Sequence, residues 1–120
     1  MSDALYRLER RRGVEVLTLL DDALITVDDI RPLREELVEI LQAMDEPRLV
    51  MNLHEVSVLD SAGLGMLLIL RATIERRSGA MVLAGVAGRL RDILQATKLD
   101  RVFPIHDSVE EAVESLLVAG

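Results

Sequence analysis

Short, largely apolar runs alternate along the chain with longer segments in which apolar residues recur every three or four positions. The short runs predict buried strands, and they occupy residues 14–20, 48–53 and 80–86. Residues 4–12 predict an edge strand that pairs with the first run through a turn at Gly13. A last short strand is predicted at 103–106, where Pro104 favours an edge position.

Helical periodicity predicts the elements between and after these strands. The predicted helices cover residues 28–44, the stretch from the segment 59–65 to about residue 77, and residues 88–98 and 109–117. Asp28 or Asp29 is suited to cap the first helix, and Pro32 fits its first turn. Ser108 and Glu111 have the spacing of a capping box at the last helix. Strands that alternate with helices predict an α/β fold with a mixed sheet and helices packed on it.

Composition and charge exclude several classes of protein. The chain has 120 residues, of which 50% are hydrophobic, so we expect one domain with a packed core. A formal net charge of -7 argues against nucleic-acid binding, which requires clustered Lys and Arg. The absence of cysteine excludes disulfides and thiolate metal sites. Because the start resembles no signal peptide and the apolar runs are too short to span a membrane, we expect a cytoplasmic protein.

Few side chains are suited to catalysis. His54 and His106 are too few and too far apart in sequence to indicate a metal site. The chain contains no Walker pattern, no G-x-G-x-x-G after a strand and no G-x-S-x-G. One tyrosine and one phenylalanine cannot form a base-stacking platform. We therefore predict that the protein is not an enzyme and requires no metal and no cofactor.

The segment LDSAGLG, residues 59–65, opens a predicted helix and has two interpretations. In the first, Asp60 or Ser61 caps the helix, which stabilises it by about 1 kcal/mol, while Gly63 and Gly65 let it pack closely on the sheet. Two glycines in a first turn nevertheless cost about 1 kcal/mol each relative to alanine. In the second, the Ser61 hydroxyl carries a phosphate, which the helix dipole and the free amides stabilise.

The helix after this segment has a sheet-facing side and a predicted docking side. At 100° per residue the sheet-facing positions are Gly63, Leu67, Leu70 and Ile74. Met66 and Ile69 point away from them, and exposed Met and Ile side chains indicate a partner surface. The alternative is that another element of the fold covers them.

An aspartyl-phosphate switch of the receiver type is a further alternative. Asp21 and Asp22 with Asp60 mimic the spacing of its acidic pair and its acceptor. Two details argue against it. Asp60 lies seven residues beyond Leu53 rather than at the end of a strand, and Phe103-Pro104 replaces the expected Lys-Pro.

The order of these segments resembles the STAS domain, and more narrowly the bacterial anti-sigma factor antagonists. The segments that carry the resemblance are LVMNL at 49–53, DSAGLG at 60–65, MVLAGV at 81–86 and LDRVF at 99–103. The resemblance covers nearly the whole chain. It implies a single STAS domain over residues 1–120, with a mixed β-sheet of four to five strands and helices packed largely on one side.

The resemblance also implies a function. In that family the serine after the aspartate is phosphorylated by a serine kinase that is itself the anti-sigma factor, which makes Ser61 the phosphoacceptor. The implied phosphoserine loop also contains Asp60, Ala62 and Gly63. The unphosphorylated domain is expected to bind the kinase, and the phosphorylated domain to release it. The expected partner-binding residues are Asp28, Leu64, Gly65, Met66 and Ile69.

Other expectations follow from the same family. A serine phosphatase that resets Ser61 is a second expected partner, and the domain is expected to be a monomer or a weak dimer. Family members have an acid beside the serine loop, for which Asp28 is the first candidate here and Asp22 the second. The alternative function is that of a constitutive STAS scaffold or adaptor in a multiprotein signalling complex.

Overall fold

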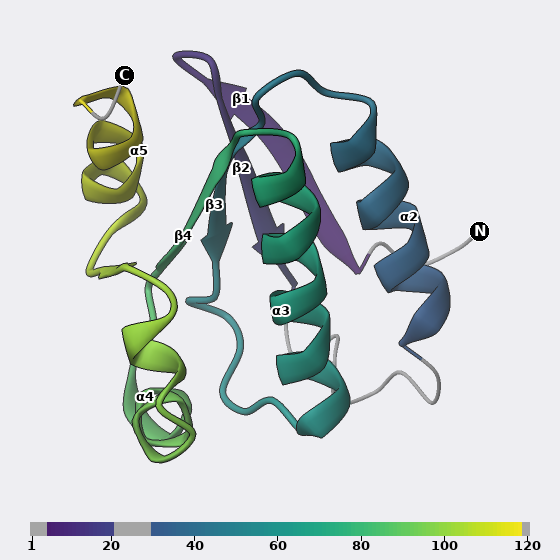
Figure 1. The fold of residues 1–120 in the computed structure, drawn as a ribbon. Helices are drawn as coiled ribbons and strands as arrows, with labels where there is room; N and C mark the ends of the chain where they lie inside the picture. The colour runs from purple at the N-terminus through teal and green to yellow at the C-terminus, as the bar shows by residue number, and fades with distance from the viewer. Residues whose placement is uncertain (1–4, 21–29, 119–120) are drawn as a thin grey trace.

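A five-stranded sheet forms the centre of the protein in the computed structural model, which describes residues 5–20 and 30–118 (Figure 1). The strand order is β1-β2-β3-β4-β5. The strands are β1 (Tyr6–Arg11), β2 (Val14–Leu19), β3 (Arg48–Asn52), β4 (Ala80–Ala84) and β5 (Ile105–His106). The hairpin β1–β2 is antiparallel and the other neighbouring strands are parallel. The predicted mixed sheet is therefore confirmed, with β1 and β5 at its edges.

Helices connect the parallel strands, as the periodicity predicts. They are α2 (Arg31–Gln42), α3 (Ser61–Arg76), α4 (Gly88–Ala96) and α5 (Val109–Val118), with a short 3₁₀ helix η1 (Leu99–Arg101) after α4. Ile30 occupies the N-cap position of α2, and Pro32 lies in the first turn as expected. Asp28 and Asp29, the predicted caps, lie outside the described residues. At α5 the Glu111 amide donates to Ser108 Oγ over 3.1 Å, which confirms that predicted cap.

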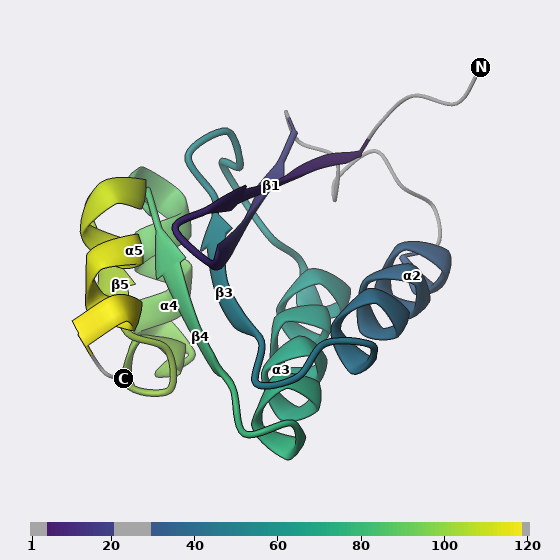
Figure 2. The same ribbon diagram turned by 90° about the horizontal axis from the view of Figure 1, so that it is seen from above.

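Helices cover both faces of the sheet but unequally (Figures 1 and 2). Side chains from α2, α3 and α4 contribute to one large apolar core, whereas α5 packs over the opposite face. All six residues of β2 are buried, because alternate side chains enter the two cores. Leu17 and Leu19 enter the larger core, while Val14 and Val16 enter the smaller one. The expectation that helices pack largely on one side is confirmed.

Candidate functional site

Asp60 caps the N-terminus of α3. It is the N-cap residue in extended conformation, and its Oδ1 accepts a hydrogen bond from the Gly63 amide over 2.9 Å. The Leu64 amide donates to the Asp60 carbonyl oxygen over 3.0 Å as the helix begins. Ser61 is the first residue of the helix and is exposed. Of the two predicted cap residues, Asp60 is the one that accepts from a free amide of the first turn, and Ser61 is exposed beside it.

The segment between β3 and α3 is anchored in the core at both ends. Near β3, Asn52 Nδ2 donates to Thr18 Oγ1 of β2 over 3.2 Å, and Asn52 Oδ1 accepts from the His54 amide over 3.3 Å. Further along, Val56 and Leu59 are 5% and 3% exposed and belong to the larger core. This anchoring gives Ser61 a defined position at the start of α3.

The two glycines of the segment have different roles. A Cβ at Gly63 would lie 3.0 Å from Leu59 Cδ2 and 3.5 Å from Asp60 Oδ1, so a small residue there leaves room for the segment before α3, whereas the sequence predicts room for the sheet. At Gly65 no described atom lies within 4 Å of such a Cβ. The prediction that Gly65 allows helix and sheet to approach is therefore wrong. Glycine is less favourable than alanine in a helix, and the packing of the described residues does not explain why position 65 holds glycine.

A row of small and apolar residues faces outward along α3. We call it the outer face of α3, and it consists of Ser61, Leu64, Gly65, Leu68, Ile69 and Ala72, all exposed or half-exposed. Leu68 and Ile69 are each 40% exposed, which confirms the predicted exposure of Ile69; its role in partner binding stays a prediction. Leu68 is missing from the sequence prediction although its signal was available, because it lies at about 160° from Leu70 on the helical wheel. The face starts at the hydroxyl of Ser61.

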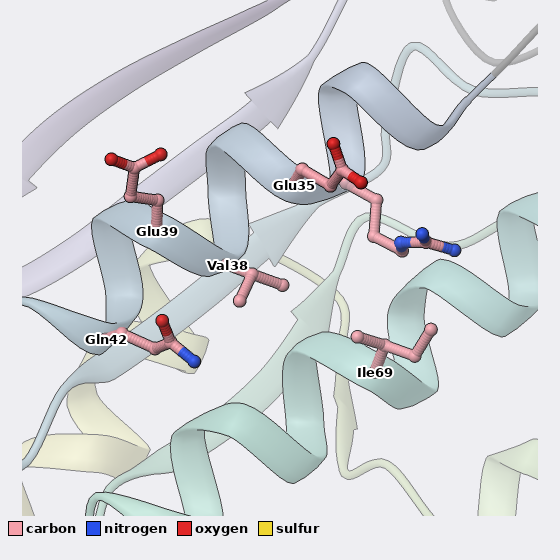
Figure 3. A pocket seen from close by; sticks show the side chains of 6 residues that line it. Glu35, Val38, Glu39, Gln42 and Ile69 are labelled. Carbon is pink, nitrogen blue, oxygen red and sulfur yellow. The ribbon is translucent and has the colours of Figure 1, made fainter.

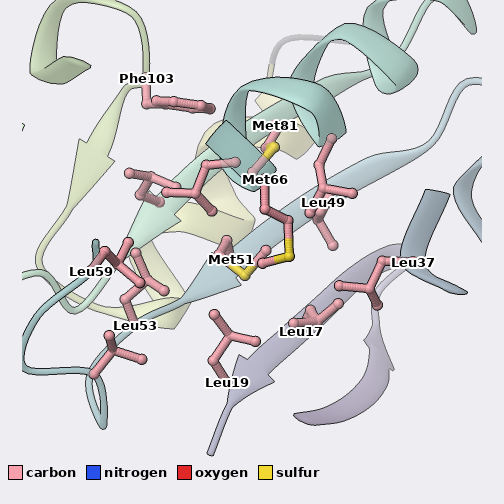
Figure 4. Packing of buried hydrophobic residues seen from close by; sticks show 14 of the residues in the cluster. Leu17, Leu19, Leu37, Leu49, Met51, Leu53, Leu59, Met66, Met81 and Phe103 are labelled. Atoms are coloured by element: carbon pink, nitrogen blue, oxygen red, sulfur yellow. The ribbon is translucent and has the colours of Figure 1, made fainter. Parts of the chain in front are cut away.

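Met66 does not belong to this outer face. The sequence predicts it as exposed beside Ile69, but it is 1% exposed. It shares the larger core with Leu37 of α2, and Figure 4 shows its side chain beside Met51 of β3. The prediction that Met66 is exposed for a partner is wrong, because at about 100° per residue it lies only about 40° from Leu70, on the side of α3 that packs on the sheet.

The remaining candidates are placed as follows. Asp28 and Asp22, the candidates for an acid beside the serine, lie outside the described residues, as does Asp21 of the receiver alternative. The Asp60 carboxylate caps α3 by accepting from the Gly63 amide, whereas a receiver-type phosphoacceptor lies at the end of a strand. Within residues 5–20 and 30–118, no group of His, Cys, Asp and Glu is arranged to hold a metal ion. The same residues include no helix with the length and apolar character of a membrane span.

Comparison with known proteins agrees with this geometry. The family model described as STAS domain matches residues 7–112. The chain belongs to the STAS domain family. Over 113 residues this STAS domain is 26% identical to the anti-sigma F factor antagonist of Paenibacillus polymyxa, covering 94% of this chain and 95% of the relative.

Solved structures share the fold of this STAS domain at lower identity. An anti-sigma-factor antagonist domain protein from Planctomyces limnophilus has a TM-score of 0.81 at 17% identity, covering 93% of this chain and 97% of the other. The Bacillus cell fate determinant SpoIIAA in its phosphorylated form has a TM-score of 0.65 at 22% identity, with coverages of 92% and 97%. The fold also occurs in a sulfate transporter family protein. The fold is thus shared among proteins of different kinds.

Removing the cap tests the local geometry. Asp60→Ala is expected to lower the free energy of unfolding by about 1 kcal/mol, because the Gly63 amide loses its acceptor. Asp60→Asn is the matched control, since asparagine caps a helix about as well as aspartate. Urea unfolding of the three proteins measures the difference. A loss of stability in the asparagine variant equal to that in alanine would contradict the role of the side-chain oxygen.

Proposed function

We propose that this STAS domain is an anti-sigma factor antagonist switched by phosphorylation of Ser61. In the unphosphorylated state the outer face of α3 binds a serine-kinase anti-sigma factor, and the phosphate causes release. The observation that carries the proposal is the exposed residue Ser61 in the first turn of α3, which Asp60 caps. The function is regulatory protein binding in the cytoplasm and involves no catalysis by this chain.

The position of Ser61 suits a phosphate electrostatically. The N-terminus of a 16-residue helix carries partial positive charge and free amides, both of which favour an anion. A phosphate therefore leaves the fold intact while adding about two negative charges at the start of an apolar docking face. A partner that buries this face would have to desolvate the charges, which opposes binding.

Two relatives support the proposal. The Paenibacillus relative is named for anti-sigma F factor antagonism, and the Bacillus protein has been solved in a phosphorylated form. In this chain an exposed Ser61 lies on the same helix as the half-exposed Leu64 and Gly65. A serine phosphatase would reset such a switch.

Phosphate mapping is the direct experiment. A serine-kinase anti-sigma factor from the same cell, incubated with this protein and ATP, is expected to add one phosphate, on Ser61. Intact-mass and peptide-fragment spectra identify the position. Ser78 is the informative competitor because it is exposed, whereas Thr73 is 1% exposed and Ser108 caps α5. Phosphate on any of these residues with Ser61 empty would overturn the assignment, and an acid-labile modification would indicate an acyl phosphate.

Gly65 offers a test that separates stability from binding. Gly65→Ala is expected to raise the free energy of unfolding by about 0.5–1 kcal/mol, because alanine favours a helix and its Cβ meets no described atom. The same methyl group lies on the outer face and is expected to weaken kinase binding. Thermal unfolding measures the first effect and calorimetry the second. A stabilised variant with unchanged affinity would show that the partner does not approach the helix at Gly65.

A further inference from the structure

The helices α2 and α3 lie side by side on the same face of the sheet (Figures 1 and 2). An open groove lies along α2 where it meets Ile69 of α3. Its volume is about 600 Å³, and its lining residues are Arg34, Glu35, Val38, Glu39, Gln42 and Ile69. The lining residues of α2 extend from Arg34 to Gln42, about 12 Å or two turns along the helix axis. The groove is shallow and open, so it suits an element of another protein better than an enclosed small molecule.

The lining of the groove combines apolar side chains with two carboxylates and one cation. Val38 of α2 and Ile69 of α3 face one another across it and provide apolar surface (Figure 3). Glu35 and Glu39 are exposed one turn apart on α2 and form the acidic rim. Arg34 is the single cation among the described lining residues. The groove thus combines an apolar floor with a rim of net negative charge.

A third carboxylate of α2 is engaged elsewhere. The Tyr6 hydroxyl of β1 donates a hydrogen bond to Glu36. This bond, with partial burial and the nearby carboxylate charge, raises the pKa of Tyr6 to about 12. Glu36 is therefore held toward β1, while Glu35 and Glu39 are left to a partner at the groove.

We infer that the groove binds an amphipathic helix of the partner that presents Lys or Arg residues one turn apart. These cations would lie opposite Glu35 and Glu39, and an aliphatic residue between them would pack on Val38 and Ile69. The inference rests on the proposed function, because Ile69 belongs to both the outer face of α3 and the groove, so one partner covers both. A second copy of this chain is the poorer occupant, since each copy carries a net charge of -7.

A designed peptide tests this chemistry without the kinase. The probe is an alanine-rich helix of about 18 residues with a leucine stripe flanked by lysines four residues apart. Added to isotope-labelled protein, it is expected to shift the amide resonances of the groove residues Val38, Glu39, Gln42 and Ile69. A second peptide with glutamate in place of each lysine is expected to bind at least about tenfold more weakly.

Two double variants with equal changes in charge test whether the peptide binds at the groove. Glu35→Lys with Glu39→Lys is expected to weaken the lysine peptide at least about tenfold. The matched control is Glu110→Lys with Glu114→Lys, a pair of the same spacing on α5, over the opposite face of the sheet. Their side chains are 79% and 58% exposed and form surface ion pairs with Arg11 and Arg12, so thermal unfolding checks that the control variant stays folded. The control is expected to change affinity by less than about threefold, since only long-range attraction is altered.

The possible results are distinct. Shifts confined to the groove, with loss only in the α2 variant, support the inference. Equal loss in both double variants, shifts elsewhere, equal binding of the glutamate peptide, no binding at millimolar peptide, or concentration-dependent self-association through the groove would each overturn it. Phosphate mapping is independent of this experiment. If the peptide does not bind but Ser61 is phosphorylated, the groove inference is wrong and the proposed function stands. If the peptide binds but Ser61 is never phosphorylated, the proposed switch is wrong and the groove inference stands.

Discussion

Ser61→Asp is expected to weaken binding of the serine-kinase anti-sigma factor by about 2 kcal/mol or more, roughly 30-fold. The carboxylate would lie at the start of the outer face of α3, where the partner has to desolvate it. The fold is expected to survive, because a negative charge at a helix N-terminus is favoured and residue 61 is exposed. Calorimetry measures the affinity, and thermal unfolding monitors the fold.

Ser61→Ala is the control for this experiment. It is expected to bind as the unmodified protein does and to remain bound when ATP is added, because it cannot accept a phosphate. Aspartate has one charge and a planar carboxylate, so chemically phosphorylated protein provides the full charge for comparison. Equal affinities for unmodified, alanine, aspartate and phosphorylated proteins would contradict the switch and leave the constitutive scaffold as the function.

Met66→Ala is expected to lower the free energy of unfolding by about 2–5 kcal/mol. The side chain is 1% exposed in the core between α3, α2 and the sheet, so its removal leaves a cavity. Ile69→Ala is the matched variant on the same helix. With 40% of Ile69 exposed, its substitution is expected to cost much less stability, about 0.5 kcal/mol, but to weaken partner binding by about 1 kcal/mol or more.

Urea unfolding and calorimetry on the two variants separate core from interface. The expected pattern is a large loss of stability for Met66→Ala, and a loss of affinity with little loss of stability for Ile69→Ala. If Met66→Ala unfolded like the unmodified protein, the burial of Met66 in the core would be contradicted. If Ile69→Ala bound the kinase with full affinity, Ile69 would not be an anchor of the outer face.

Much of the fold follows from local patterns in the sequence. The apolar runs at β2, β3 and β4 indicate strands buried on both faces, and strands alternating with helices require parallel connections. The turn at Gly13 predicts the antiparallel hairpin that places β1 at an edge. These features depend on residues that are neighbours in sequence, and so they can be predicted without tertiary contacts.

The sequence by itself also determined where the candidate site lies. An acid, a hydroxyl and small residues before an apolar helix indicate an exposed Ser61 at an amide-rich terminus. The choice of Asp60 over Ser61 as the cap required the structure, since either oxygen can reach the free amides of a first turn. The outward position of Gly65 likewise depends on which side of α3 meets the sheet.

Helical periodicity indicates the exposure of Leu68, but only the tertiary structure decided which apolar residues beside the sheet-facing side of α3 are covered. Helical periodicity gives the angle of each residue about the helix axis but not the directions from which other elements approach. The core between the sheet, α2 and α3 includes Met66, whereas Leu68 and Ile69 are left exposed. The groove with Glu35 and Glu39 arises in the same way, because it joins residues of two helices that are distant in the chain.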